Sequence, residues 1–180
     1  MSLILKKIIL SVIVLIIIAC FILIISAIYM GVFATAEISS TETGPYYYIA
    51  FSQKNLYQNT DIKINFLRNM LEEKNIQHLH PLCIFSEDPL NIPEDQLYNQ
   101  TAYIILDSVE IDSPFTCKKI ESRQVAIASI NAHPIIASYK TYPELHIWLR
   151  RNNYKLDRTK LILEHYNPDG SVGVEFPITK

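Results

Sequence analysis

The sequence lacks clustered positive charge. Its 16 Lys and Arg residues stand against 18 Asp and Glu residues, and only Lys6 and Lys7 of these cations precede residue 50. The chain after residue 30 therefore carries 14 cationic and 18 anionic side chains, a net charge of −4. Affinity for nucleic acids comes largely from clustered cations, so binding to a phosphate backbone is not expected. We interpret the short pairs Lys118-Lys119 and Arg150-Arg151 as solvated surface.

Cysteine is also scarce, with three in 180 residues. Cys20 falls inside an apolar run, which leaves Cys83 and Cys117 as the only pair that could form a disulfide in the rest of the chain. Two cysteines in a domain of this size do not make a disulfide framework. Nothing in the sequence places them side by side, so we expect both thiols to be free.

Catalytic motifs are missing as well. No P-loop and no nucleophile elbow occurs, and a Ser-His-Asp set cannot be assembled from spacing alone. His78 and His80 would share one face of a strand, and a His-x-His pair can bind metal. No third ligand lies at a suggestive spacing, so surface or structural histidines are favoured. We expect no metal and no cofactor.

The chain is rich in apolar residues, and they are concentrated at its beginning. The run from Ile8 to Met30 holds 23 residues with no charge, Gly or Pro. A helix of this length would be roughly 34 Å long, enough for the roughly 30 Å hydrocarbon core of a bilayer. We therefore predict a transmembrane anchor within residues 1–30, followed by a short linker at residues 31–44.

The flanks of the apolar run predict its orientation. Two lysines precede it, whereas Glu37 and Glu42 follow it. The positive-inside bias then predicts a cytoplasmic N-terminus and an extracytoplasmic domain. Two alternatives remain, because Ala34-Thr35-Ala36 resembles a signal-peptidase site and Ile17–Cys20 faintly resembles a lipobox. The apolar core is longer than the roughly 7–15 residues of a signal peptide, which favours a retained anchor.

Residues 45–180 are predicted to form one α+β domain. Runs of aliphatic and aromatic residues predict strands, and apolar residues recurring every four positions predict two helices. One helix follows the capping residues Asn59-Thr60-Asp61, and the other begins at the capping-box pattern Thr141-Tyr-Pro-Glu144. The resulting order, strand-helix-strand-strand, occurs twice, which indicates an internal repeat.

The repeat can be traced in short matching segments. Ile49-Ala50-Phe51 corresponds to Val125-Ala126-Ile127, and Cys83–Pro89 corresponds to Ile162–Pro168, at offsets of 76 and 79 residues. Each half would form a mostly antiparallel sheet with one helix on one face. Two such halves packed side by side would leave a groove between their open faces.

One predicted strand, Leu161–Tyr166, carries a charge in an apolar run. Glu164 and Tyr166 share one face of this strand, and Leu161 and Leu163 lie on the other. If the two leucines pack under a helix, Glu164 points away from that helix and into the groove. A carboxylate in such a strand must be solvated, paired or used in function.

Four short motifs follow one another along the chain: Gly44-Pro45-Tyr46, Phe85-Ser-Glu-Asp88-Pro89, Leu163-Glu164-His-Tyr166 and Phe176-Pro177-Ile178. Together with the order of elements, they resemble the GyrI-like small-molecule-binding domain, also called the AraC-type effector-binding domain, of the SOUL-related fold. The resemblance covers residues 45–179 and implies two β-α-β-β units around a central groove. Its members include effector domains of transcription regulators, a gyrase-inhibitory protein, a hydrolase branch and a membrane-anchored form.

The resemblance implies that Glu164 is the groove carboxylate that binds cationic or polar ligands, with Tyr166 as its aromatic companion. The repeat puts Phe85 at the equivalent position of the first half. Tyr48 and Trp148 are further candidate wall residues. A carboxylate among aromatic rings suits an organic cation, because the π faces are negative and the carboxylate neutralises the charge.

We therefore expect a single-pass membrane protein whose groove binds a small amphipathic or cationic ligand, as a sensor or carrier. Its expected partners are that ligand and the lipid bilayer, which it would meet through residues 8–30. Two alternatives stay open. One is a hydrolase of the same fold that uses Glu164 as a general base, and the other is a protein-docking module.

Overall fold

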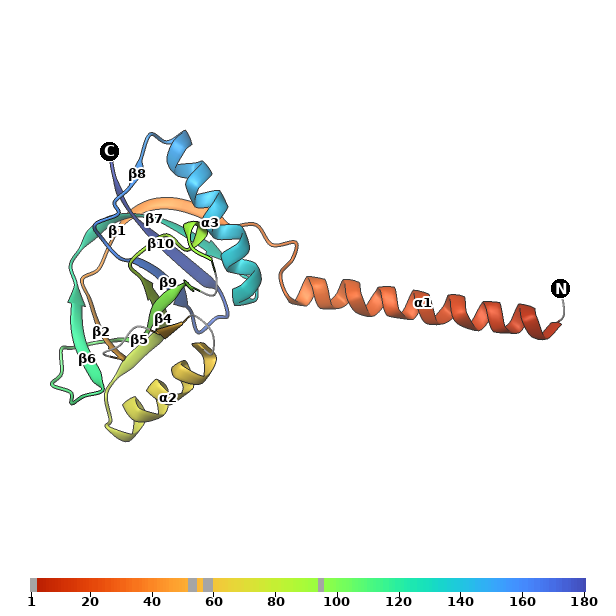
Figure 1. The fold of residues 1–180 in the computed structure, drawn as a ribbon, viewed down its shortest axis with the longest axis horizontal. Helices are drawn as coiled ribbons and strands as arrows, with labels where there is room; N and C mark the ends of the chain where they lie inside the picture. The colour runs from red at the N-terminus through yellow and green to blue at the C-terminus, as the bar shows by residue number, and fades with distance from the viewer. Residues whose placement is uncertain (1–2, 52–54, 57–59, 94–95) are drawn as a thin grey trace.

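The structure is a computed structural model that describes residues 3–51, 55–56, 60–93 and 96–180. The predicted α+β class is confirmed (Figure 1). In chain order the elements are α1 (Leu3–Tyr29), β1 (Glu37–Thr43), β2 (Tyr46–Phe51), β3 (Asn55–Leu56), α2 (Thr60–Glu73), β4 (His78–Phe85), the 3-10 turn η1 (Pro89–Asn91), β5 (Tyr98–Ile105), β6 (Phe115–Ile120), β7 (Arg123–Ile130), α3 (Pro134–Arg151), β8 (Lys155–Leu156), β9 (Ile162–Tyr166) and β10 (Val172–Thr179).

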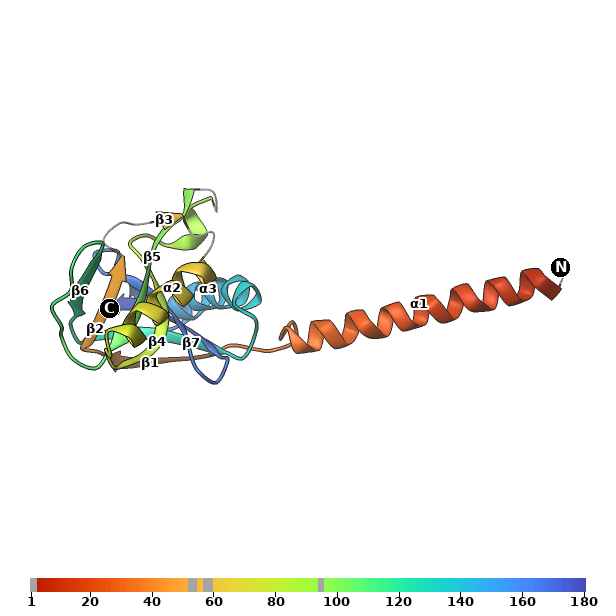
Figure 2. The ribbon, with the colours of Figure 1, turned by 90° about the horizontal axis from the view of Figure 1, so that it is seen from below.

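The first helix stands away from the rest of the molecule (Figure 1 and Figure 2). Its stretch Ile9–Tyr29 is 21 residues long, and none of it is buried by the domain. A helix of this length and apolar composition is able to cross a membrane. The other two long helices differ, because each has one apolar stripe that packs on the sheet.

The stretch predicted as a linker, residues 31–44, holds a strand. β1 pairs antiparallel with β7 from Glu37 opposite Ser129 to Thr43 opposite Arg123. The Ser and Thr residues that suggested a linker are compatible with an edge strand whose outer face is solvated. Ile38 is the residue of β1 that packs against the core. The domain therefore includes β1, ahead of the predicted boundary at residue 45.

The repeat predicted from the sequence is present. β2-α2-β4-β5 forms the first unit and β7-α3-β9-β10 the second. The main sheet runs β1-β7-β10-β9-β4-β5-β2-β6, and the two units meet at the antiparallel pair β4–β9. β1 leads directly into β2, and β6 leads directly into β7. The two strand pairs at the ends of this order, β1–β7 and β2–β6, therefore form one continuous antiparallel ladder. The sheet therefore curls back on itself as a ring of strands (Figure 1).

Both α2 and α3 pack on the outer face of this ring. α2 contributes Leu67 and Leu71, and α3 contributes Leu145 and Leu149. Each fully buried leucine stabilises the fold by roughly 1.5–3 kcal/mol. The inner face of the ring is filled by a separate cluster made of Tyr48, Ala50, Leu82, Ile84, Ala102, Ile104, Ile120 and Leu163.

The position of Leu163 corrects one expectation. The groove position of Glu164 was expected on the condition that Leu163 packs under a helix, with Glu164 pointing away from that helix. Leu163 instead fills the inner cluster, and the face of β9 that carries Glu164 is the one covered by α3. The strand is buried on both faces because the sheet is a ring, so apolar side chains do not identify the face that meets a helix.

The start of α3 corrects another expectation. The helix begins at Pro134, about two turns before the predicted capping box at Thr141. Proline suits the first turn of a helix because its fixed φ is helical and its missing N–H is not needed there. The Thr141 hydroxyl lies inside the helix and donates to the Ala137 carbonyl at 2.9 Å. Pro143, which suggested a helix start, is tolerated in the interior.

Candidate ligand-binding site

Strand β9 brings Glu164 under α3, where the residue is 1% exposed. Its carboxylate lies within hydrogen-bonding distance of three hydroxyls, of which the Ser138 hydroxyl also lies 3.0 Å from the Pro134 carbonyl oxygen. Tyr166 Oη donates to Oε1 at 2.8 Å and Tyr142 Oη donates to Oε2 at 3.0 Å. Ser138 Oγ lies 3.2 Å from both oxygens. Tyr166 is on the same strand face as Glu164, and Ser138 and Tyr142 are neighbours on one face of α3 because they are four residues apart.

The three hydroxyl donors hold the carboxylate in a fixed place. Hydrogen bonds to an ionised group are roughly twice as strong as those between neutral groups. A buried charge is tolerated only where polar groups surround it. The site therefore holds a carboxyl group at a defined position in the wall of the adjacent cavity.

A cavity of about 310 Å³ lies beside this carboxylate. Glu164 and Ser138 supply its polar wall, and small-molecule sites of about 300–1,000 Å³ commonly combine a few polar groups with apolar lining. An apolar cavity with one fixed charge suits an amphipathic ligand. The remaining wall consists of Phe85, Pro89, Leu90, Ile92, Leu97, Tyr139, Tyr142 and Pro143.

The structure brings together some of the residues predicted for the site. Glu164 and Phe85 both line the cavity, and Tyr166 bonds to the carboxylate from the same strand. Tyr48 lies in the inner cluster, on the other side of the sheet, because it alternates away from the helices along β2. Trp148 stacks on Tyr154 near the end of α3, with ring centroids 5.7 Å apart, and is not among the cavity residues.

Three hydroxyl-bearing residues of the site were missed in the sequence. Ser138, Tyr139 and Tyr142 all come from the first half of α3, which we predicted to begin too late. The i, i+4 spacing of Ser138 and Tyr142 would have indicated a shared helix face, once the helix start at Pro134 had been recognised. The positions of these hydroxyls relative to Glu164 depend on the packing of α3 against β9.

Cys83 on β4 lies opposite Glu164 in the β4–β9 ladder. Its buried sulfur accepts a hydrogen bond from Asn99 Nδ2 at 3.0 Å, and Tyr166 Oη lies 3.5 Å away. Burial, followed by the charge of Glu164, raises the pKa of the Cys83 thiol to about 12. The thiol is therefore neutral near physiological pH and is a poor nucleophile. Cys83 and Cys117 are both free.

We expect Cys83 to resist alkylation in the folded protein, because its thiol is buried and protonated. Cys117 on β6 is only half-buried. Iodoacetamide at mildly alkaline pH should modify Cys117 of the full chain readily and Cys83 only after denaturation, as read by peptide mass spectrometry. Equal rates at the two thiols before unfolding would contradict this expectation.

A second polar cluster lies on the inner face of the ring. His165 of β9 has Nε2 at 3.1 Å from Oε1 of Glu175 on β10, and Nδ1 at 3.0 Å from Nε2 of His80. Tyr46 Oη donates to Glu175 at 2.9 Å, and the Arg123 guanidinium lies 3.4 Å from the same carboxylate. The sheet separates this cluster from the cavity, so we assign it a structural role.

Protonation of this cluster at acidic pH destabilises the folded state. Burial alone would raise the pKa of Glu175, but the hydrogen bond and charge of His165, with Tyr46 and Arg123, together hold it below the ordinary value of 4.5. Burial, followed by the charge of His165, lowers the pKa of His80 below its ordinary value of 6.5. Both shifts mean that the folded state binds protons less readily than the unfolded chain, so stability falls as the pH falls.

We predicted that His78 and His80 share one face of a strand, and this prediction is wrong. A register shift between His78 and Pro81 interrupts the β4–β5 ladder. His78 packs edge-on against Tyr103 on the outer face, whereas His80 meets His165 on the inner face. Across the residues that the structure describes, no group of three or more His, Cys, Asp or Glu side chains is placed to hold a metal ion.

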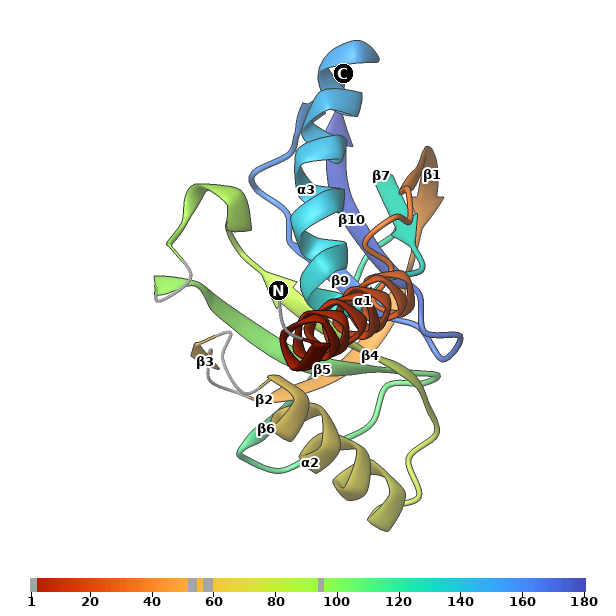
Figure 3. The same ribbon diagram turned by 90° about the vertical axis from the view of Figure 1, so that its right-hand side faces the viewer.

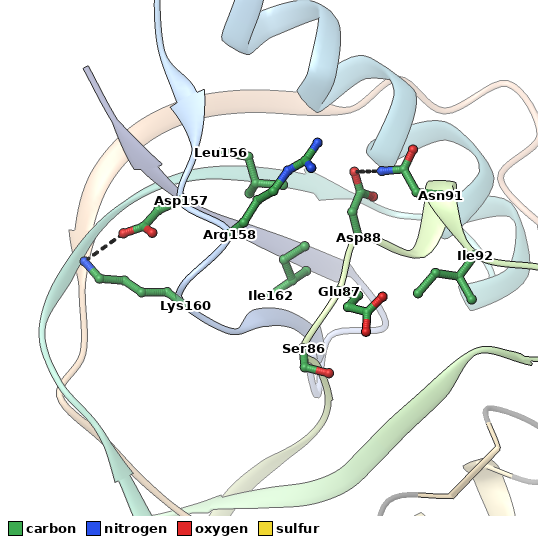
Figure 4. Close-up of a pocket in the computed structure, with 10 residues that line it drawn as sticks. All are labelled: Ser86, Glu87, Asp88, Asn91, Ile92, Leu156, Asp157, Arg158, Lys160 and Ile162. Carbon is green, nitrogen blue, oxygen red and sulfur yellow. Dashed lines mark hydrogen bonds and ion pairs between the residues drawn. The ribbon is translucent and has the colours of Figure 1, made fainter.

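A smaller cavity of about 180 Å³ opens between the loop after β4 and the segment joining β8 to β9 (Figure 4). Its charged side chains have both signs, and two of them form an ion pair. Lys160 Nζ lies 3.4 Å from Asp157, while Asp88 accepts a hydrogen bond from Asn91 at 2.9 Å and lies 2.7 Å from His146 Nε2. This cavity offers no single fixed charge, so the cavity beside Glu164 is the better candidate.

This chain is similar to known proteins in its three-dimensional structure. No family model and no curated protein matches the chain. The structure of an EcmrR–DNA complex matches with a TM-score of 0.62 at 15% identity, over 81% of this chain and 58% of the EcmrR chain. The crystal structure of the EcmrR C-terminal domain matches with a TM-score of 0.61 at 14% identity, over 82% of this chain and 98% of that domain.

A third solved structure, SAV2435 bound to tetraphenylphosphonium, matches with a TM-score of 0.52 at 12% identity, over 79% of this chain and 94% of that one. At these identities the likeness shows the fold alone. The predicted fold of two β-α-β-β units is therefore one that the EcmrR C-terminal domain and SAV2435 share. The chain spans less than two thirds of the EcmrR chain, so it corresponds to part of that protein.

Proposed function

We propose that this protein is a membrane-anchored binding protein for a small cationic or amphipathic molecule, acting as a sensor or carrier. The observation that carries the proposal is the buried Glu164 carboxylate in the wall of an apolar cavity. Hydroxyls of Ser138, Tyr142 and Tyr166 fix its position. A ligand with a positive head and an apolar body complements this arrangement.

The energetics favour a cation over a neutral molecule of the same shape. At an effective dielectric constant of about 20, two unit charges about 4–5 Å apart attract by roughly 3–4 kcal/mol. The rings of Tyr139 and Tyr142 line the same cavity, and a cation over an aromatic face gains about 0.5–2 kcal/mol more. These gains must offset the desolvation of the ligand. The fold shared with SAV2435, which has been seen bound to tetraphenylphosphonium, supports the same ligand class.

The alternative of hydrolysis with Glu164 as general base has less support. A general base must reach the proton of an attacking water with one of its oxygens. Hydroxyl donors already reach both oxygens of Glu164. Cys83 does not supply a nucleophile in its neutral form. Binding without turnover is the function that this geometry favours.

We extend the proposal to the anchor. α1 would cross the bilayer through residues 8–30, and Lys6 and Lys7 would hold the N-terminus on the cytoplasmic side by the positive-inside bias. The domain would then lie outside the cytoplasm and meet ligands there. The length and apolar composition of α1 support this placement.

Tetraphenylphosphonium should bind the full chain in lipid nanodiscs, and Glu164→Gln should weaken that binding by at least about tenfold. The substitution keeps the size of the side chain and removes the charge that attracts the cation. Isothermal titration calorimetry gives the affinity once the signal from nanodiscs without protein has been subtracted.

Tetraphenylborate is a matched control ligand because it has nearly the same shape and the opposite charge. We expect the wild type to prefer tetraphenylphosphonium, and Glu164→Gln to reduce that preference. Glu121→Gln is the control variant, since this side chain is 75% exposed in the turn between β6 and β7. Equal affinity of the wild type and Glu164→Gln for tetraphenylphosphonium would refute the proposal.

A further inference from the structure

The end of α1 is in direct contact with the domain. The backbone N–H of His133, just before α3, donates to the carbonyl oxygen of Met30 at 3.0 Å. Gly31 has a φ of +74°, and a Cβ added to it would lie 2.6 Å from the Cα of Ala132. A side chain at this position would therefore push the two segments apart. No spacer separates the apolar helix from the domain.

A lysine on α3 strengthens this contact. Lys140 Nζ donates to the carbonyl oxygen of Val32 at 2.6 Å and to that of Ala34 at 2.5 Å. Both carbonyls belong to the few residues that follow α1. The exit of α1 is thus bonded to the start of α3 at two places, which fixes the side of the domain from which the anchor emerges.

The same part of α3 lines the cavity beside Glu164. Ser138, Tyr139 and Tyr142 lie six to ten residues beyond Ala132, which is at most about 15 Å along a helix. The polar headgroup layer is about 5–8 Å thick on each side of a bilayer. If α1 crosses the bilayer, the cavity lies at the membrane surface or just above it.

The side of the domain that α1 leaves is rich in exposed apolar groups. Figure 3 looks at this side, and α3 and the strands β4 and β9 beside it are seen behind the projecting α1. Tyr139, on the cavity wall, is 83% exposed, and Ile135, one turn earlier, is 63% exposed. Phe33, between α1 and β1, is 71% exposed. Aromatic and aliphatic side chains in such positions are well accommodated at the headgroup level of a membrane.

We propose that the cavity opens onto the bilayer surface and takes a single-chain cationic amphiphile from the membrane leaflet beside it. The charged head of the amphiphile meets Glu164, and its chain follows the apolar wall past Tyr139 toward the lipid. This inference rests on the proposed function and adds to it the class and the source of the ligand.

The first test asks whether the mouth of the cavity contacts lipid. Trp148 is the only tryptophan of the chain. Trp148→Phe therefore gives a chain without tryptophan, and Tyr139→Trp is introduced into that variant. In nanodiscs made with acyl-brominated lipids, the introduced fluorophore should lose at least half of its emission. The matched control is Lys118→Trp in the same background, because Lys118 is exposed on β6, across the domain from α1 (Figure 1). Its emission should stay unchanged.

The second test asks for the ligand class. Hexadecyltrimethylammonium incorporated in the nanodisc should displace tetraphenylphosphonium from the wild type at a total concentration at least tenfold lower than tetramethylammonium, its water-soluble head. Both are quaternary cations, so the difference reports the chain and the membrane. Glu164→Gln, if it still binds tetraphenylphosphonium measurably, should weaken the binding of both cations, because both heads would lose the same charge.

The outcomes separate the two proposals. Loss of emission at position 139 alone, with better displacement by the long-chain cation, supports the inference. Equal quenching at positions 139 and 118, or equal displacement by the two cations, overturns it even if tetraphenylphosphonium binds in a manner that depends on Glu164. Absence of any tetraphenylphosphonium binding instead refutes the proposed function.

Discussion

Glu175→Gln should destabilise the domain by about 3–5 kcal/mol, the usual cost of removing one partner from a buried ion pair. Glu175 is 1% exposed and Arg123 is 6% exposed, so loss of the carboxylate charge leaves a buried guanidinium without its counterion. The hydroxyls of Tyr46 and Thr43 lose a charged acceptor at the same time. Denaturant unfolding of the full chain in nanodiscs, followed by far-ultraviolet circular dichroism, measures the difference.

The difference in unfolding free energy between the wild type and Glu175→Gln should become smaller at acidic pH. The pKa of Glu175 is held below its ordinary value of 4.5, so its contribution to stability is complete above that pH and is lost as the pH falls through the lower folded pKa. A protonated wild-type carboxyl then resembles the amide. Glu121→Gln serves as the exposed control, with little change expected. A gap that persists unchanged through the acid range would contradict the assignment of the buried charge to Glu175.

The double variant Tyr142→Phe with Tyr166→Phe should lose about 3 kcal/mol or more of unfolding free energy. A hydrogen bond to a charged group contributes about 1.5–3 kcal/mol, and each substitution deletes one such bond to the Glu164 carboxylate. The two hydroxyls reach different oxygens of one buried carboxylate, so we expect their effects to be coupled. A double-mutant cycle with denaturant unfolding measures that coupling directly.

Tyr139→Phe is the matched control for this pair. Its ring lines the same cavity, but the residue is 83% exposed, so removal of its hydroxyl should change stability by no more than about 0.5 kcal/mol. A loss in the control as large as that in either single variant would show that general repacking, rather than support of Glu164, causes the effect.

Much of the fold could be predicted because its elements leave local signals. The two strand-helix-strand-strand units were visible in the matching segments around Ile49 and Val125. β1 was not, because its Ser and Thr residues resemble a linker and its pairing with β7 is set by distant sequence. The face of β9 that carries Leu163 could not be assigned either, since both faces of a ring-shaped sheet are buried.

The centre of the site could be predicted, whereas its surroundings could not. Glu164 stood out as a charge in an apolar strand, and the structure places it in a cavity wall together with Phe85. Ser138 and Tyr142 depend on the true start of α3, which the internal Pro143 obscured. Aromatic residues such as Tyr48 pack equally well on the inner face, so their type alone does not assign them to a cavity.

The pairing of β1 has a consequence for the order in which the chain matures. Ile38 pairs with Ala128, which lies 90 residues later. Contacts so far apart in sequence form slowly, because the entropy cost of closing a long loop must be met before the contacts stabilise the chain. If α1 crosses the bilayer as proposed, a nascent chain would hold β1 unpaired beside the bilayer until β7 had been synthesised. A product truncated after the first repeat unit would keep that strand edge exposed next to the membrane. The exposed edge would then be open to proteolysis and to pairing with strands of other chains.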